Sequence, residues 1–198
     1  MPTPIGHALG GIAAGCLVVA ASALAPGPRS RRFELERFLA RIGPWRGLAA
    51  IACLATIPDV DLLLGIHRGP AHSVGAMLIA AAVAGAWTRS AGPCVAAAAA
   101  AAYGSHVLLD WLGADPSAPH GIMALWPWSR EFHLSNAHLF LRVCREYWLA
   151  DCWWHNLRAV ARELAILGPI AAAAVLAARR GGAGRPACYR QRNGPRRA

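Results

Sequence analysis

Apolar residues gather into five runs along this chain, and polar links separate the runs. The runs cover residues 5–24, 47–66, 73–87, 93–112 and 164–178. A helix needs about 20 apolar residues to cross a bilayer, within a range of about 17–25, so the third and fifth runs are on the short side. The pattern predicts an all-α, multi-pass membrane helical bundle of about five apolar helices. A soluble bundle of deeply buried helices is the alternative.

The link between the fourth and fifth runs is long and rich in aromatic residues. It contains the turn Leu125-Trp126-Pro127-Trp128, and residues 132–167 then follow a helical pattern with Trp148, Trp153 and Trp154 near its middle. Trp is enriched at membrane–water interfaces. We therefore expect an interfacial helical segment here, which lies on the membrane surface or covers the ends of the spans.

Composition agrees with a membrane protein but leaves a second reading open. Hydrophobic residues make up 56% of the 198 residues and charged residues 15%, against about 25% charged in a typical soluble domain. The formal net charge is +10, and every basic residue apart from His is Arg. A basic, apolar chain fits either a membrane protein with cytoplasmic Arg clusters or a nucleic-acid binder. The positions of the Arg residues distinguish the two.

The Arg residues are concentrated in the links at one side of the predicted bundle. Residues 29–46 hold six Arg and two Glu, Arg89 lies between the third and fourth runs, and residues 179–197 hold seven Arg and no acid. The positive-inside rule makes these stretches cytoplasmic. The chain is then an inner-membrane protein with its N-terminus outside and its C-terminus in the cytoplasm, and no specific nucleic acid is predicted as a partner.

The same topology divides the chain into two parts and places one pair of cysteines outside. Residues 1–180 form a membrane-embedded domain, and residues 181–198, rich in Gly, Pro and Arg, form a disordered basic C-terminal tail. None of the six Cys residues forms a C-x-x-C pair. Cys144 and Cys152 could form a disulfide if their segment faces an oxidising compartment.

Ionisable side chains in or beside the apolar runs are the main indication of function, because such groups are costly in a membrane. All of them are types that bind metal ions. They are His7, Asp59, Asp61, His67, His72, His106 and Asp110. The topology deduced from Arg places all of them at the outer ends of the spans, which predicts one shared metal site.

The spacing of these residues agrees with a shared site. His106 and Asp110 are four residues apart and lie on one face of a helix. Asp59 and Asp61 follow a proline, and His72 comes shortly after a Gly-Pro turn. Each piece also has a simpler interpretation: a buried hydrogen-bonded pair, a helix cap, or solvated charge. Arg68 is either a flanking charge or a group that holds an anionic part of a substrate.

Several motifs resemble the YdjM-like family of membrane-bound metal-dependent hydrolases. The matching pieces run in order through about residues 1–130: Met1-Pro2-Thr3-Pro4-Ile5-Gly6-His7, Pro58-Asp59-Val60-Asp61, His67-Arg68-Gly69, His72-Ser73, His106-Val107-Leu108-Leu109-Asp110, and residues 121–129. The resemblance implies hydrolysis without naming a substrate.

The order of ligands is also similar to that of zinc-dependent phospholipases C. That similarity implies one ion held by Asp59 or Asp61 with His72, His106 and Asp110, and a second ion held by His7 with Asp110.

These observations together predict a metal-dependent hydrolase. We expect one to three divalent ions, with zinc as the leading candidate, and Asp59 or Asp61 as the catalytic general base. A site at the outer surface places membrane lipid nearby and favours a lipid or a phosphoester as substrate. A metal-binding membrane protein without catalysis, such as a transporter or a sensor, is the alternative.

Overall fold

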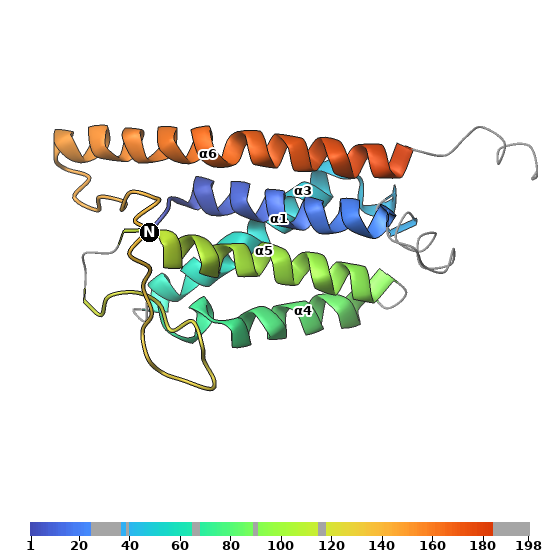
Figure 1. Ribbon diagram of the computed structural model, residues 1–198, viewed down its shortest axis with the longest axis horizontal. Coiled ribbons are helices and arrows are strands. Elements are labelled where there is room, and N and C mark those ends of the chain that lie inside the picture. The colour runs from blue at the N-terminus through green and yellow to red at the C-terminus, as the bar shows by residue number, and fades with distance from the viewer. Residues whose placement is uncertain (25–36, 39, 65–67, 89–90, 115–117, 184–198) are drawn as a thin grey trace, which may run out of the picture.

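The computed structural model describes residues 1–24, 37–38, 40–64, 68–88, 91–114 and 118–183, and within them it forms a helical bundle (Figure 1). The helices are α1 (Pro4–Leu24), α3 (Pro44–Thr56), α4 (Val74–Thr88), α5 (Gly92–Leu112) and α6 (Ala150–Ala183), with the short 3-10 helices η1 (Ile57–Leu64) and η2 (Pro70–His72). Two isolated β-bridges, Gly113–Phe140 and Ile122–His133, are the β structure of the described residues. The predicted all-α class is confirmed.

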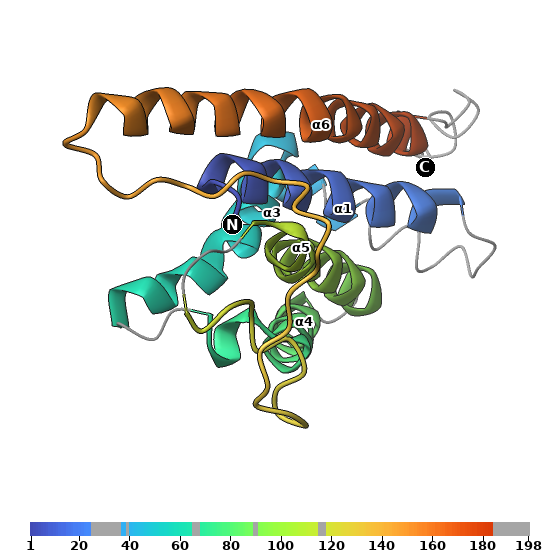
Figure 2. The ribbon, with the colours of Figure 1, turned by 60° about the vertical axis from the view of Figure 1, so that its left-hand side comes forward.

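Helix α1 occupies the middle of the bundle. It packs against α3, α5 and α6, while α4 packs against the far side of α5 (Figure 2). Glycines on α1 permit this close packing: a Cβ at Gly11 would collide with that of Ala55, and a Cβ at Gly15 would lie 2.9 Å from Ile51 Cγ2. Small residues bring membrane helices together in this way, because they let two backbones approach.

In the part of the chain that the structure describes, three helices are long and apolar enough to cross a membrane: α1, α5 and the Ala150–Arg180 part of α6. Helix α4 is apolar but shorter. The second apolar run forms no single α-helix, since α3 ends at Thr56 and the chain continues as η1. Pro58 explains the change, because proline lacks a backbone N–H and its ring clashes with the carbonyl group of the preceding helical turn.

The helix predicted over residues 132–167 is wrong in its first half, because α6 begins only at Ala150. The preceding segment is extended and pairs with distant backbone: the Leu139 N–H donates to the Leu112 carbonyl at 2.8 Å, and the Ala114 N–H donates to the Phe140 carbonyl at 2.9 Å. The buried Phe140 ring packs with Leu109 and Leu167. These long-range contacts outweigh the local helical pattern.

A disulfide ties the end of this extended segment to α6. It joins Cys144 and Cys152, the two cysteines whose pairing the sequence left open. The side chain of Asn156 adds hydrogen bonds to both the N–H and the carbonyl of Cys144, at 2.8 and 3.0 Å. Residues 142–149 therefore form a strap that is fastened to the first turns of α6, and we call this segment the strap below.

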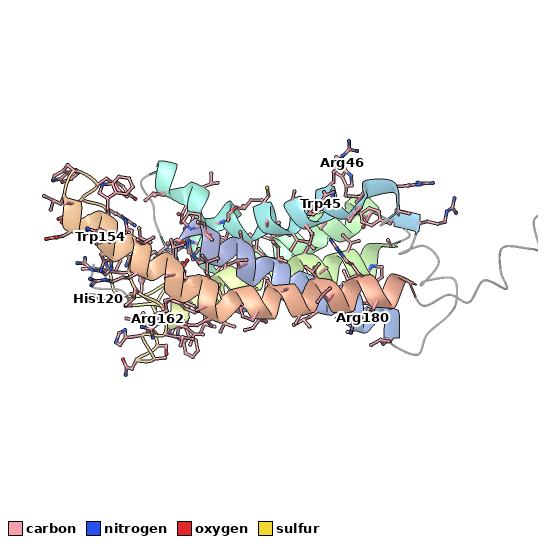
Figure 3. The ribbon with its side chains drawn as sticks, turned by 90° about the horizontal axis from the view of Figure 1, so that it is seen from above. Trp45, Arg46, His120, Trp154, Arg162 and Arg180 are labelled. Carbon is pink, nitrogen blue, oxygen red and sulfur yellow. A yellow bond between two sulfur atoms is a disulfide. The ribbon has the colours of Figure 1, made fainter. Side chains whose placement is uncertain are left out.

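The two ends of the bundle differ in their side chains. Arg46 and Arg180 lie at one end beside Trp45, and His120, Trp154 and Arg162 lie at the other (Figure 3). At the first end the Arg179 guanidinium lies 6.0 Å from the centre of the Trp45 ring, within reach of a cation–π contact. Helix α6 ends at Ala183, so the remainder of the predicted tail is outside the described residues, as are Arg89 and residues 29–36.

The contact between α1 and α3 makes a stability prediction. Gly11→Ala should lower the free energy of unfolding by about 1–3 kcal/mol, because the added methyl group overpacks the helix contact. Gly47→Ala, in α3 with no atom within 4 Å of the added Cβ, should instead gain about 0.5–1 kcal/mol from helix propensity. Thermal unfolding of both variants in detergent measures the difference, and equal behaviour of the two would contradict the packing explanation.

Candidate metal centre

Five of the predicted ligands come together at one end of the bundle. His7 projects from the first turns of α1, and His106 and Asp110 lie in the last two turns of α5. Asp59 belongs to η1, and His72 is the last residue of η2. The start of α1 and the end of α5 lie at the same end of the bundle (Figures 1 and 2), and the 3-10 helices bring the other two side chains to it.

The ligand atoms are close to one another. Asp110 lies at the centre: its Oδ1 is 3.2 Å from His7 Nε2, and its Oδ2 is 3.4 Å from His72 Nε2 and 3.3 Å from His106 Nε2. Asp59 Oδ1 is slightly farther away, 3.7 Å from His72 Nε2 and 3.8 Å from His106 Nε2. The His7 and His106 rings also stack, with their centroids 3.8 Å apart.

These separations fit a metal ion better than a hydrogen-bonded cluster. Four atoms at zinc-bond lengths of about 2.0–2.1 Å in a tetrahedron are about 3.3 Å from one another. Within the described part of the chain, His106 Nε2 and both Asp110 oxygens are buried and make no hydrogen bond. Buried polar atoms are almost always hydrogen-bonded. Atoms that are this close without bonding to each other are typical of ligands that face a common cation.

The cluster has room for more than one arrangement of ions. Two overlapping groups have all their ligand atoms within 4.8 Å of one another: His7, His106 and Asp110, and Asp59, His72 and His106. The two Asp110 oxygens face different histidines, Oδ1 toward His7 and Oδ2 toward His72 and His106. A carboxylate placed in this way can bind one ion or bridge two.

The opposite ring nitrogens of two histidines are fixed by the protein. His106 Nδ1 lies 2.7 Å from the carbonyl oxygen of Ala55. His72 Nδ1 lies 3.1 Å from Asp61 Oδ2. Both partners only accept hydrogen bonds, so Nδ1 carries a proton and Nε2 is the nitrogen that faces the candidate centre. The structure therefore places Asp61 behind His72, whereas the sequence had grouped it with the ligands.

Charges around His72 favour its protonated form when no ion is bound. Burial acts to lower the pKa of His72, but contacts with the carboxylates of Asp59 and Asp61 outweigh burial and raise the pKa to about 9. Burial acts to raise the pKa of Asp59, but contacts with His72 and His106 outweigh burial and hold that pKa below its usual value. A cation must therefore displace a proton from His72 in order to bind.

The two remaining predicted site residues have different outcomes. His67 lies outside the described residues. Arg68 is buried, with 7% of its surface exposed, and its Nη1 donates a hydrogen bond of 2.9 Å to the Pro119 carbonyl. Together with Asp59, Arg68 lines a cavity of about 300 Å³ next to the cluster. The structure thus places Arg68 beside the candidate centre and outside its ligand set.

Glu163 of α6 is an important residue that the sequence analysis missed. Its carboxylate is fully buried and accepts hydrogen bonds from the N–H of Thr3, at 2.7 Å, and from the Thr3 hydroxyl. The Thr3 carbonyl in turn accepts from the N–H of His7 at 3.1 Å. Glu163 thus fixes the turn that presents His7. An acid next to an apolar run was the available signal, but the neighbouring Arg162 made it resemble a solvated surface charge.

Comparison with known proteins identifies the family. Residues 1–182 match the YdjM inner membrane protein family, and the chain belongs to it. This confirms the family expected from the motifs and supports an inner-membrane location. No curated protein and no solved structure matches the chain, so the similarity to zinc-dependent phospholipases C receives no support.

Loss of the central carboxylate should remove bound metal. Asp110→Asn should reduce the zinc content of the purified protein to background, because the amide is neutral and cannot serve both groups of ligands. Asp151→Asn, an exposed acid on α6, makes the same change in charge away from the cluster and should retain the metal. Elemental analysis by mass spectrometry compares the two variants, and equal zinc in both would argue against the centre.

Asp61 should affect metal affinity without being a ligand. Asp61→Asn should weaken zinc binding by about 10–100-fold, as expected for a group that orients a metal-binding histidine, and should leave the stoichiometry at saturation unchanged. Competition with a chelating dye measures both quantities. A lower stoichiometry at saturating zinc would instead make Asp61 a direct ligand.

Proposed function

We propose that this member of the YdjM family is a metal-dependent hydrolase with zinc as the expected ion. It acts on a lipid or another phosphoester at the outer face of the inner membrane, where the membrane meets water. The observation that carries this proposal is that the Nε2 atoms of His7, His72 and His106 each lie 3.2–3.4 Å from an oxygen of Asp110. Three segments far apart in the sequence bring these groups together in an apolar bundle, and a shared cation accounts for that convergence.

The residues divide into holding, positioning and reacting groups. His7, His72, His106 and Asp110 would hold the metal, which when bound supplies a Lewis acid and lowers the pKa of water toward about 7. Asp61 orients His72. Asp59 is the ligand candidate that reaches solvent, with 30% of its side chain exposed, so it is the carboxylate best placed to take a proton from attacking water.

The predicted orientation puts the site on the outer, non-cytoplasmic side of the inner membrane. Arg46 and Arg180 lie at the bundle end opposite Trp154 (Figure 3), and the positive-inside rule assigns the Arg end to the cytoplasm. The disulfide of Cys144 with Cys152 supports this orientation independently, because disulfides persist in oxidising compartments such as the periplasm. With the N-terminus out and the C-terminus in, the site lies at the level of outer-leaflet headgroups.

The interior of the bundle favours hydrolysis over transport. Within the described residues, the acidic, basic and imidazole side chains of α1, α4 and α5 are His7, His106 and Asp110, all at one end. A transporter needs a binding site near the middle of the membrane and a polar route to each side. Metal binding without turnover remains the competing result of the experiment below.

The experiment separates metal binding from catalysis. The protein is reconstituted in nanodiscs with zinc and assayed with a phospholipid and with a soluble phosphodiester. Asp59→Asn should lower the turnover by about 10²-fold or more, the usual contribution of a general base, and should retain at least part of the zinc. The control is Asp151→Asn, which should match the wild type. Activity that persists in His106→Ala or with a chelator would contradict the proposal, and zinc binding without activity would favour a sensor.

A further inference from the structure

The candidate centre is open on one side. His7, His72, His106 and Asp110 have at most 1% of their surface exposed, whereas the side chain of Asp59 is 30% exposed. Asp59 also forms part of the wall of the cavity of about 300 Å³. Within the described residues this cavity therefore adjoins the exposed side of the ligand cluster, at Asp59.

The wall of the cavity is positively charged when the centre holds a metal. Its charged side chains are those of Asp59, Arg68, Arg142, Arg145 and Glu146. Three guanidinium groups therefore face two carboxylates, and a cation bound beside Asp59 would add further positive charge. Arg is the side chain best suited to phosphate, because its planar fork donates two parallel hydrogen bonds to two oxygens.

Arg68 is held in place on this wall. Its side chain is buried and donates to the Pro119 carbonyl at 2.9 Å, and its own carbonyl accepts from the N–H of Met123 at 3.1 Å. A guanidinium that is already fixed loses little conformational entropy when it binds an anion. Arg68 thus provides a rigid positive group on the wall that it shares with Asp59.

The other two guanidinium groups belong to the strap. Arg142 and Arg145 flank Cys144, whose disulfide with Cys152 and hydrogen bonds with Asn156 attach the strap to α6. His155 Nε2 adds a hydrogen bond of 2.8 Å to the Arg142 carbonyl. These contacts, all to the first two turns of α6, hold the backbone of both arginines beside the cavity.

From this arrangement we infer that the cavity is a phosphate-binding subsite, in which Arg142 and Arg145 of the disulfide-tied strap, together with Arg68, bind the phosphate of the substrate next to Asp59. The inference rests on the proposed hydrolase function and specifies its substrate class: a phosphoester with a small headgroup. A volume of about 300 Å³ is at the lower limit of ligand pockets, which suits a phosphate with a small headgroup.

Binding of a phosphoester probe tests the subsite without relying on turnover. Calorimetric titration of the zinc-loaded protein in detergent uses sn-glycerol 3-phosphate as the probe. Arg142→Gln with Arg145→Gln should weaken binding by about 10-fold or more, because charge-assisted hydrogen bonds are lost, while the zinc content stays at the wild-type level. Arg142→Lys with Arg145→Lys should keep an intermediate affinity, because the charge remains without the fork.

A matched control separates a local effect from a change in overall charge. Arg130→Gln with Arg162→Gln removes two exposed arginines that are not part of the cavity wall, and this variant should bind the probe as the wild type does. Equal affinity in the cavity variant and in the control would overturn the subsite even if zinc and turnover were normal. A wild-type protein without zinc would instead contradict the proposed function.

Two further arms test the strap and the origin of the phosphate. Cys144→Ser with Cys152→Ser should weaken probe binding and leave the zinc content unchanged; unchanged probe affinity would overturn the role of the strap.

Phosphatidylglycerol in mixed micelles should compete with the probe if the natural phosphate belongs to a lipid headgroup. If phosphatidylglycerol does not compete while the probe still binds, the subsite stands and the source is a soluble phosphoester.

Discussion

The structure depends on the burial of one carboxylate in the membrane-spanning bundle. Asp110 lies within α5 with 1% of its surface exposed, and an ion removed from water in this way costs several kcal/mol unless opposite charge compensates it. The Nε2 atoms of His7, His72 and His106 each lie within 3.4 Å of one of its oxygens. Because these histidines come from α1, η2 and α5 itself, three elements meet at this one carboxylate.

Contacts behind the cluster allow this meeting. Glycines on α1 bring it close to α3 and α5, which lets the His7 ring stack on that of His106. Glu163 on α6 fixes the turn before His7 through Thr3, and Ala55 on α3 orients the His106 ring. The geometry of the ligands therefore depends on the packing of the helices, because a shift of α1 would move His7.

The ligands could be predicted from the sequence because ionisable side chains are costly in a membrane and are therefore rare in apolar runs. His106 and Asp110 stand out in an apolar run, and their spacing alone places them on one helix face. The role of Asp61 was not predictable, because only the fold decides which nitrogen of His72 it meets. The extended segment around Phe140 was misread for a similar reason: its hydrogen bonds go to residues about 27 positions earlier, such as Leu112, and no local pattern records them.

The openness of the centre bears most directly on what it does. Structural zinc sites are usually closed by four protein ligands, often Cys, whereas catalytic sites keep a position for water or substrate. The free cysteines Cys16, Cys53 and Cys94 take no part in the candidate ligand groups, and Asp59 connects the cluster to a cavity lined by arginines. A purely structural ion would gain nothing from the exposure of Asp59 to water, whereas the proposed hydrolase needs an opening of this kind.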